Sequence, residues 1–165
     1  TESNFTPKSY EDVDAESATT TESIGKAVVK IAKDLHAAAI IASTERGGTA
    51  QMISKFRPAC PIVAVSPHEA IVRRLQLNWG VQAVTGKEAS DTDAVVDNAI
   101  FAALDNDLIK AGDLVVLTAG VPVAKAGSTN MIRVQVVGDV LLRGTGIGHN
   151  SAIGKVCIEI GRAHV

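Results

Sequence analysis

A group of hydroxyl-bearing and glycine residues separates a short apolar segment from a helical pattern in "IIASTERGGTAQMISKFRP", residues 40–58. Adjacent glycines allow backbone amides to turn inward, hydroxyl side chains beside them can donate hydrogen bonds, and a helix that follows would point its positive end at the same place. The residues that carry these groups are Ser43, Thr44, Gly47, Gly48 and Thr49. This combination predicts a phosphate-binding loop. A tight turn with a helix N-cap would use the same residues. The pattern does not decide between the two, because it is neither a Walker loop nor GxGxxG.

A second glycine-rich turn, "AGVPVAKAGSTN" at residues 119–130, follows a later apolar segment. It stands at the end of a predicted strand, and in parallel sheets ligands bind where the strands end. We therefore expect this turn either to close over the first one or to be a flexible loop that holds no ligand.

Other side chains that could react do not form a catalytic set. No histidine has a nucleophile or a carboxylate at a spacing that indicates a catalytic pair or triad, which favours surface positions for all of the histidines. The histidines are His36, His68, His149 and His164. Cys60, between two prolines, is interpreted as a packed thiol and Cys157 as a strand residue, and the two have no metal-ligand spacing. Arg73 and Arg74 are adjacent and point in different directions from a helix, which suits a solvated face or a subunit contact.

Helical periodicity predicts the elements that would position the first turn. Thr19 and Glu22 have the spacing of a capping box, so a helix is expected to begin there. The segment "TAQMISKFRP" directly after the first turn predicts a second helix, which must stop before Pro58 because a proline disfavours helical geometry in the residue before it.

Two further helices are predicted from cap signals. Ser66 is expected to cap the third helix, with Pro67 at its first position and Glu69 three residues after the cap. Ser90 and Asp93 are expected to open the fourth helix in the same way. Each predicted helix stands beside a short apolar segment of strand length.

The apolar segments between these helices predict five strands in one sheet. They are "AAAIIAS", "PIVAVS", "WGVQAVTG", "GDLVVLTAG" and "MIRVQVVG". Alternation of strand and helix requires crossover connections, which indicates parallel strands with helices on both faces. The last strand follows the second glycine-rich turn without a helix, so it is expected to run antiparallel to its neighbour. The predicted fold class is α/β, a three-layer αβα arrangement around a mainly parallel five-stranded sheet with one antiparallel strand.

Composition divides the chain into three parts and excludes some partners. Residues 1–18 are acidic and polar, which predicts a linker from a missing upstream domain. Residues 19–138 are predicted to form one α/β domain. Residues 139–165 contain several glycines, and we expect them to be the start of another module. A net charge of -2 without a basic run argues against nucleic acid as a partner. The absence of a long apolar run argues against a membrane, and free thiols favour a reducing cytoplasm.

The order of these motifs resembles one family over about residues 17–138. The matching stretches are "TTESIGKAVVKIAKDL", "AIIASTERGGTAQMISKFRPACPIVAVSPHEAIVRRLQLNWGV" and "GDLVVLTAGVPVAKAGSTNMIRV". They resemble the C-terminal regulatory domain of pyruvate kinase. The tail "GDVLLRGTGIGHNSAIGKV" is similar to the start of the extra C-terminal module of some bacterial pyruvate kinases.

The resemblance implies that the first turn cradles the phosphate of an allosteric effector, either a sugar phosphate or a nucleotide monophosphate. Carried over to this chain, the site comprises Ser43, Thr44, Glu45, Gly47, Gly48, Thr49, Gly127, Ser128, Thr129 and Asn130. Glu45 stands where family members that bind fructose 1,6-bisphosphate often place a lysine, so the implied effector is a monophosphate.

The resemblance also implies a parent enzyme of glycolysis that transfers a phosphoryl group from phosphoenolpyruvate to ADP, works as a tetramer and uses magnesium and potassium. Its catalytic residues belong to an upstream domain, so this chain is expected to hold no complete active site and no cofactor. One alternative is an interaction or oligomerisation domain with a vestigial effector loop. Another is a free-standing enzyme with its own phosphate-substrate site, which the lack of acid and base groups around the first turn disfavours.

Overall fold

The structure is a computed structural model that describes residues 19–89, 91–120 and 129–138. Within these residues five strands form one sheet in the order β3-β2-β1-β4-β5. The strands are β1 (Ala39–Ser43), β2 (Ile62–Ser66), β3 (Val81–Thr85), β4 (Leu114–Ala119) and β5 (Met131–Val136). The pairs among β1, β2, β3 and β4 are parallel, and β5 runs antiparallel to β4, which confirms the predicted sheet.

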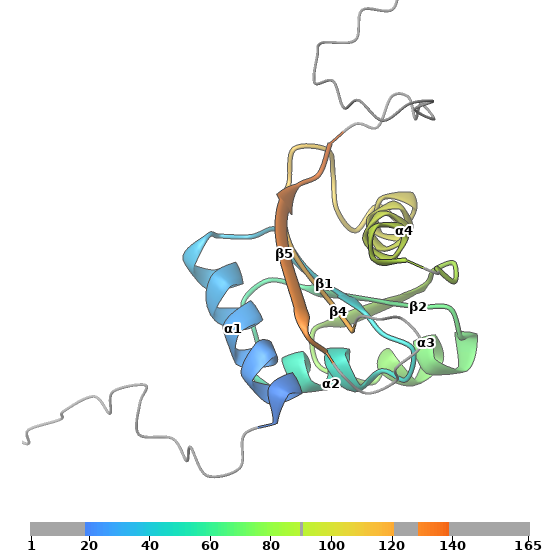
Figure 1. Ribbon diagram of the computed structural model, residues 1–165, viewed down its shortest axis with the longest axis horizontal. Helices are drawn as coiled ribbons and strands as arrows, with labels where there is room; N and C mark the ends of the chain where they lie inside the picture. The colour runs from blue at the N-terminus through green and yellow to red at the C-terminus, as the bar shows by residue number, and fades with distance from the viewer. Residues whose placement is uncertain (1–18, 90, 121–128, 139–165) are drawn as a thin grey trace, which may run out of the picture.

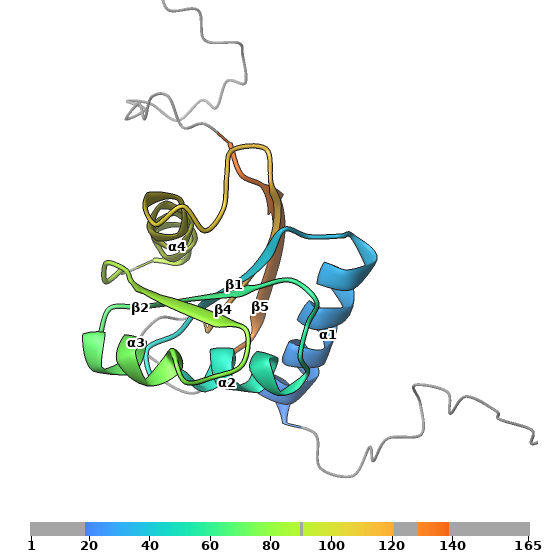
Figure 2. The ribbon, with the colours of Figure 1, turned by 180° about the vertical axis from the view of Figure 1, so that it is seen from behind.

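Helices cover both faces of this sheet (Figures 1 and 2). They are α1 (Thr20–Asp34), α2 (Gly48–Lys55), α3 (Glu69–Leu75) and α4 (Thr92–Asp105). Helix α4 packs on one face, whereas α1, α2 and α3 contribute to the hydrophobic cluster on the other. The three-layer αβα architecture is therefore the one that the sequence predicts. The segments 1–18 and 139–165, predicted as a linker and a further module, lie outside the described residues.

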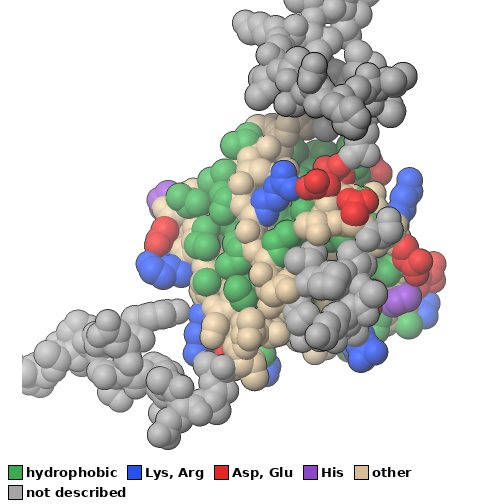
Figure 3. All heavy atoms as spheres, in the orientation of Figure 1, with side chains coloured by type: hydrophobic (Ala, Val, Ile, Leu, Met, Phe, Trp, Pro, Cys, Tyr) green, Lys and Arg blue, Asp and Glu red, His purple; other side chains and the backbone are tan. Residues whose placement is uncertain are grey.

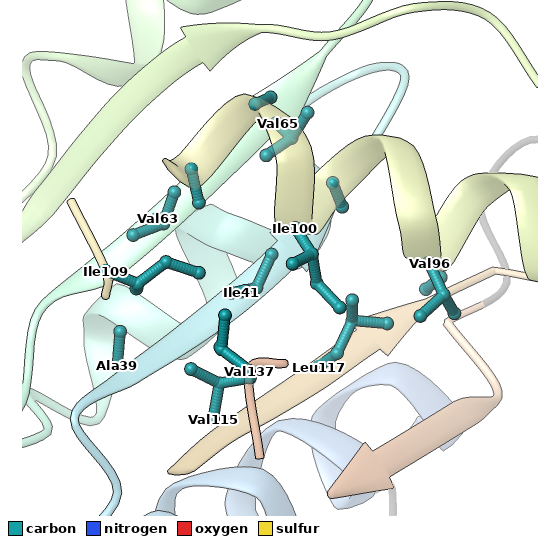
Figure 4. Close-up of a cluster of buried hydrophobic side chains, with 14 of the residues drawn as sticks. Ala39, Ile41, Val63, Val65, Val96, Ile100, Ile109, Val115, Leu117 and Val137 are labelled. Carbon is teal, nitrogen blue, oxygen red and sulfur yellow. The ribbon is translucent and has the colours of Figure 1, made fainter. Parts of the chain in front are cut away.

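Side-chain alternation along the central strands fills both layers of the core. Ile41 of β1 lies beside Val63 of β2 and Leu117 of β4, and all three are buried on the face that α4 covers (Figure 4). The preceding position of each strand faces the other layer, where Ile40, Ile62 and Val116 are fully buried. Strands buried on both faces read as continuous apolar runs, which is why these segments lack a polar alternation.

The first two helices begin within one residue of the predicted position, and α2 ends before Pro58 as predicted. Thr19 is the N-cap of α1, and its hydroxyl accepts a hydrogen bond from the Glu22 N–H at 3.2 Å. The Glu22 carboxylate pairs with Lys26 at 3.1 Å. Helix α2 ends at Lys55, before Pro58, and the chain turns out of the helix at Arg57 with a φ of 46°.

The predicted starts of α3 and α4 are wrong. Ser66 is the last residue of β2, where its pairing with Thr85 of β3 keeps it extended, and α3 begins at Glu69 with His68 as the N-cap. The Ser66 hydroxyl still accepts a hydrogen bond from the His68 N–H, at 3.3 Å. Helix α4 is capped by Asp91, whose carboxylate accepts from the Ala94 N–H at 2.9 Å.

The predicted cap of α4, Ser90, lies outside the described residues. A cap at Asp91 places a carboxylate at the positive end of the helix, where the charge adds to the hydrogen bond. Ser90 and Asp91 are adjacent in the sequence and both have the residue type of a cap. The cap of α4 is Asp91, the charged residue of the two.

Candidate functional site

The glycine turn, residues 43–49, lies at the edge of the sheet where the parallel strands end. It connects the end of β1 to the start of α2, and the Thr44 N–H donates to the Val65 carbonyl of β2 at 2.9 Å. Strand β4 ends at the same edge beside β1, and β5, which pairs antiparallel with β4, begins there. The glycine turn and the described end of the second predicted turn, Thr129 and Asn130, therefore lie at one edge of the sheet, whereas residues 121–128 lie outside the described residues.

Gly47 gives the glycine turn its shape. Its φ is 86°, a left-handed conformation that favours glycine. A Cβ atom at this position would lie 3.0 Å from Leu75 Cδ2 and 3.4 Å from Ile71 Cγ2, so a side chain there would also have to displace the side chain of Leu75 on α3. Gly48 is different, because it is the first residue of α2 and a Cβ there would meet nothing within 4 Å.

Hydroxyl and amide groups meet at the start of α2. The Thr44 hydroxyl accepts a hydrogen bond from the Gly47 N–H at 3.0 Å, which closes the turn. The first bond of the helix runs from the Gln51 N–H to the Gly47 carbonyl at 3.0 Å. The N–H groups of Gly48, Thr49 and Ala50 precede that bond and point away from the helix at its positive end.

The two turns contact each other through a pair of hydroxyl groups. Thr49 Oγ1 lies 2.6 Å from Thr129 Oγ1, and Thr129 is only 4% exposed. Asn130 follows Thr129, and its N–H donates to the Ala119 carbonyl at 3.2 Å, so the start of β5 is attached to the end of β4. Gly127 and Ser128 lie outside the described residues.

Helix α3 and its approach contribute contacts that sequence reasoning missed. The Arg74 guanidinium donates to the Arg46 carbonyl at 2.5 Å, and the Ser66 hydroxyl donates to the Glu45 carbonyl at 3.4 Å. The sequence predicts a solvated face or a subunit contact for Arg74, because the pattern of a single helix does not show which loop its arginine reaches. The strand order is the signal that could have suggested it, since β2 and α3 follow directly beside β1 and α2.

The outer part of the glycine turn carries charge. Glu45 and Arg46 are exposed, whereas Ser43, Thr44 and Thr49 are half-buried and Gly47 is buried. The turn that leads into α2 therefore exposes one acidic residue, Glu45, and one basic residue, Arg46, and the Arg74 guanidinium lies against its backbone. Arg73 points elsewhere and lies 3.9 Å from Glu69 on its own helix.

The described residues outside the glycine turn offer little chemistry. They contain no cluster of three or more histidine, cysteine, aspartate and glutamate side chains that could hold a metal ion. Burial raises the pKa of the Cys60 thiol, which makes the reactive thiolate scarcer at neutral pH. His36 follows α1 in a left-handed conformation, and His68 caps α3. Cys157, His149 and His164 lie outside the described residues.

No helix among residues 19–89, 91–120 and 129–138 has both the length and the apolar character that crossing a membrane requires.

Comparison with known proteins finds similar sequences and a similar fold in one family. Residues 22–135 match the family model described as pyruvate kinase, alpha/beta domain. The pyruvate kinase of Geobacillus stearothermophilus is 48% identical over 144 residues, which cover 87% of this chain and 24% of that protein. That of Staphylococcus aureus is 42% identical over 135 residues, covering 82% of this chain and 23% of that protein.

A solved structure agrees with these sequence matches. The crystal structure of a pyruvate kinase from Cryptosporidium parvum is similar with a TM-score of 0.64 and 29% sequence identity, over 73% of this chain and 23% of that one. The chain thus spans about a quarter of the length of the relatives that it matches.

Proposed function

Since this chain belongs to the pyruvate kinase family and corresponds to its C-terminal alpha/beta domain, we propose that it is a regulatory domain that binds the phosphate of an allosteric effector at the glycine turn. The observation that carries this proposal is the convergence of the Thr44 and Thr49 hydroxyls with the first amides of α2 at one end of the sheet. Backbone N–H groups at a helix N-terminus favour a phosphate, because they supply both hydrogen bonds and a positive potential.

The proposed effector site contains the residues Ser43, Thr44, Glu45, Gly47, Gly48, Thr49, Gly127, Ser128, Thr129 and Asn130. Occupation of this site would shift an assembly of subunits between states and thereby change a distant active site. The effector proposed is a sugar phosphate or a nucleotide monophosphate.

The protein that contains this domain is proposed to act as a pyruvate kinase in glycolysis. In this proposal a separate catalytic domain transfers the phosphoryl group from phosphoenolpyruvate to ADP with magnesium and potassium, and the subunits form a tetramer. The domain described here contributes regulation and subunit contacts, and nucleic acid and membranes have no part in its function.

Calorimetric titration of ribose 5-phosphate into the 165-residue chain tests the proposed site. We expect saturable binding that disappears when ribose replaces ribose 5-phosphate, because the phosphate supplies the contacts. Equal heats for the two ligands, or no binding of ribose 5-phosphate, would contradict the proposal.

Glu45 is expected to select monophosphates over bisphosphates. A carboxylate beside a bound phosphate repels it, and the repulsion grows with the charge of the ligand. We predict that the chain binds ribose 5-phosphate more tightly than fructose 1,6-bisphosphate. The substitution Glu45→Lys should shift the ratio of the two affinities toward the bisphosphate by more than about tenfold, which corresponds to ~1.4 kcal/mol.

Titration of both ligands into the wild type and Glu45→Lys measures this ratio. A wild type that already prefers the bisphosphate would show that Glu45 is not the selector. So would a lysine variant with both affinities unchanged, since the carboxylate would then face solvent away from the ligand. Asp105→Lys is a suitable control, because it changes the charge by two units in the same direction at an exposed carboxylate, which lies at the end of α4 on the opposite face of the sheet.

A second candidate function is subunit association with a vestigial effector loop. The observation that favours it is the edge strand β5, where Val134 and Val136 are 41% and 59% exposed. Figure 3 shows hydrophobic side chains gathered over the part of the surface formed by α1 and β5. Unpaired strand edges with apolar side chains favour pairing with another chain. Sedimentation analysis that finds oligomers, together with a failed ribose 5-phosphate titration, would favour this function over the effector site.

A further inference from the structure

The contact between Thr49 and Thr129 joins residues that are 80 positions apart in the sequence. The two Oγ1 atoms lie 2.6 Å apart, a short distance for a hydroxyl pair, and Thr129 is almost fully buried. Thr49 is half-buried and belongs to the first turn of α2, next to the amides that precede the first helical hydrogen bond. The Thr129 hydroxyl is thus buried against the first turn of α2.

The backbone around Thr129 is fixed by neighbouring contacts. The fully buried Thr118 hydroxyl donates to the Met131 carbonyl at 2.9 Å, and the Asn130 N–H donates to Ala119. Both contacts attach the first residues of β5 to β4, an inner strand of the sheet. Thr129 therefore holds its hydroxyl in a position that the sheet defines.

Hydrogen-bond accounting sets the direction of the bond when a phosphate is present. A hydroxyl group has one proton to donate and lone pairs that accept, and a phosphate dianion only accepts. Either threonine can be the donor in the unliganded pair. Once the Thr49 hydroxyl donates its hydrogen bond to a phosphate, Thr129 has to be the donor in the pair. The hydroxyl hydrogen of Thr129 then points at Thr49 Oγ1.

We propose that Thr129 is a positioning residue for the effector phosphate: its buried hydroxyl donates to Thr49 Oγ1 and orients the Thr49 proton toward the ligand. This inference rests on the proposed phosphate site. Thr129 does not touch the phosphate. It acts through Thr49, and the chain from Thr129 to Thr49 to phosphate is strengthened because each hydrogen bond polarises the next.

The chain of hydrogen bonds also gives the effector a contact with the edge of the sheet. A phosphate that accepts the hydrogen bond of Thr49 favours the arrangement in which Thr129 contacts α2. Thr129 lies two residues before β5 begins at Met131. Ligand binding would thereby stabilise the start of the edge strand through a single side-chain pair.

Four variants of the 165-residue chain test the inference by calorimetric titration with ribose 5-phosphate. Thr129→Val keeps the shape of the side chain and removes the hydroxyl, and it should weaken binding by about tenfold, because Thr49 then loses the neutral hydrogen bond that orients and polarises its own bond to the phosphate. Thr129→Ser keeps the hydroxyl and should bind within about threefold of the wild type. In the Thr49→Val background, adding Thr129→Val should change the affinity by less than about twofold, because the group it positions is already missing.

The outcomes separate the inference from the proposed function. A wild type that does not bind ribose 5-phosphate overturns both. Normal binding by Thr129→Val, failure of Thr129→Ser to restore binding, or an equal loss from Thr129→Val in the Thr49→Val background overturns the inference and leaves the phosphate site in place. Urea unfolding of each variant identifies a folding defect, and a folded Thr129→Val with tenfold weaker binding supports the positioning role.

Discussion

Replacing Leu117 by alanine is expected to lower the free energy of unfolding by about 3 kcal/mol, within the usual range of ~2–5 kcal/mol for truncation of a large buried side chain. Leu117 is fully buried in β4 and lies beside Ile41 of β1 (Figure 4). Its partner on the other side is Arg133 of β5. The backbone on both sides is held by strand pairing, so neighbouring groups cannot move in to fill the space. The cavity would therefore remain and add to the lost burial.

Urea unfolding of Leu117→Ala against Leu77→Ala measures this effect with the same chemical change at two sites. Leu77 is 88% exposed after α3, so its truncation should change the free energy of unfolding by less than about 0.5 kcal/mol. A similar cost at both positions would show that Leu117 does not lie in a closely packed core. A cost below ~1 kcal/mol for Leu117→Ala would show that the layer between the sheet and α4 is loosely packed.

Much of the fold could be predicted because the signals that define it are local. Continuous apolar runs of strand length, separated by helical periodicity, identify parallel strands buried on both faces. The sequence shows no helical pattern directly before the last apolar segment, which predicts an antiparallel final strand, and β5 pairs with β4 in this way. Local signals failed where two of them competed. Ser66 has the residue type of a cap, yet pairing with β3 keeps it in the strand.

The candidate site was predictable in its residue types and less so in its contacts. Hydroxyls and glycines between a strand and a helix suggested the glycine turn, and the strand order brings it to the edge of the sheet where ligands bind. The contacts of Thr49 with Thr129 and of Arg74 with the Arg46 carbonyl depend on how distant segments pack. A sequence pattern cannot supply them, because it does not contain the rotation of α3 or the path from β4 to β5.

The Gly-Gly pair shows the same limit, because its two residues look equivalent in the sequence but not in the structure. Gly47→Ala is expected to lower the free energy of unfolding by about 2 kcal/mol. A left-handed conformation costs a residue with a Cβ atom ~1–2 kcal/mol, and the new atom would also lie 3.0 Å from Leu75. The loop would have to change shape to relieve this, so the affinity for ribose 5-phosphate should fall by more than about tenfold.

Gly48→Ala is the matched substitution, and it should have the opposite sign. Gly48 begins α2 in open space, and alanine is the better helix former by up to ~1 kcal/mol, so this variant should be as stable as the wild type or more so. Urea unfolding and ribose 5-phosphate titration of both variants separate the two positions. Equal effects of the two substitutions would contradict the assignment of the left-handed position to Gly47. A Gly47→Ala variant that is destabilised but binds normally would show that the amides of α2 hold the ligand without the turn, because Gly47 is required for the shape of the turn and not for the helix.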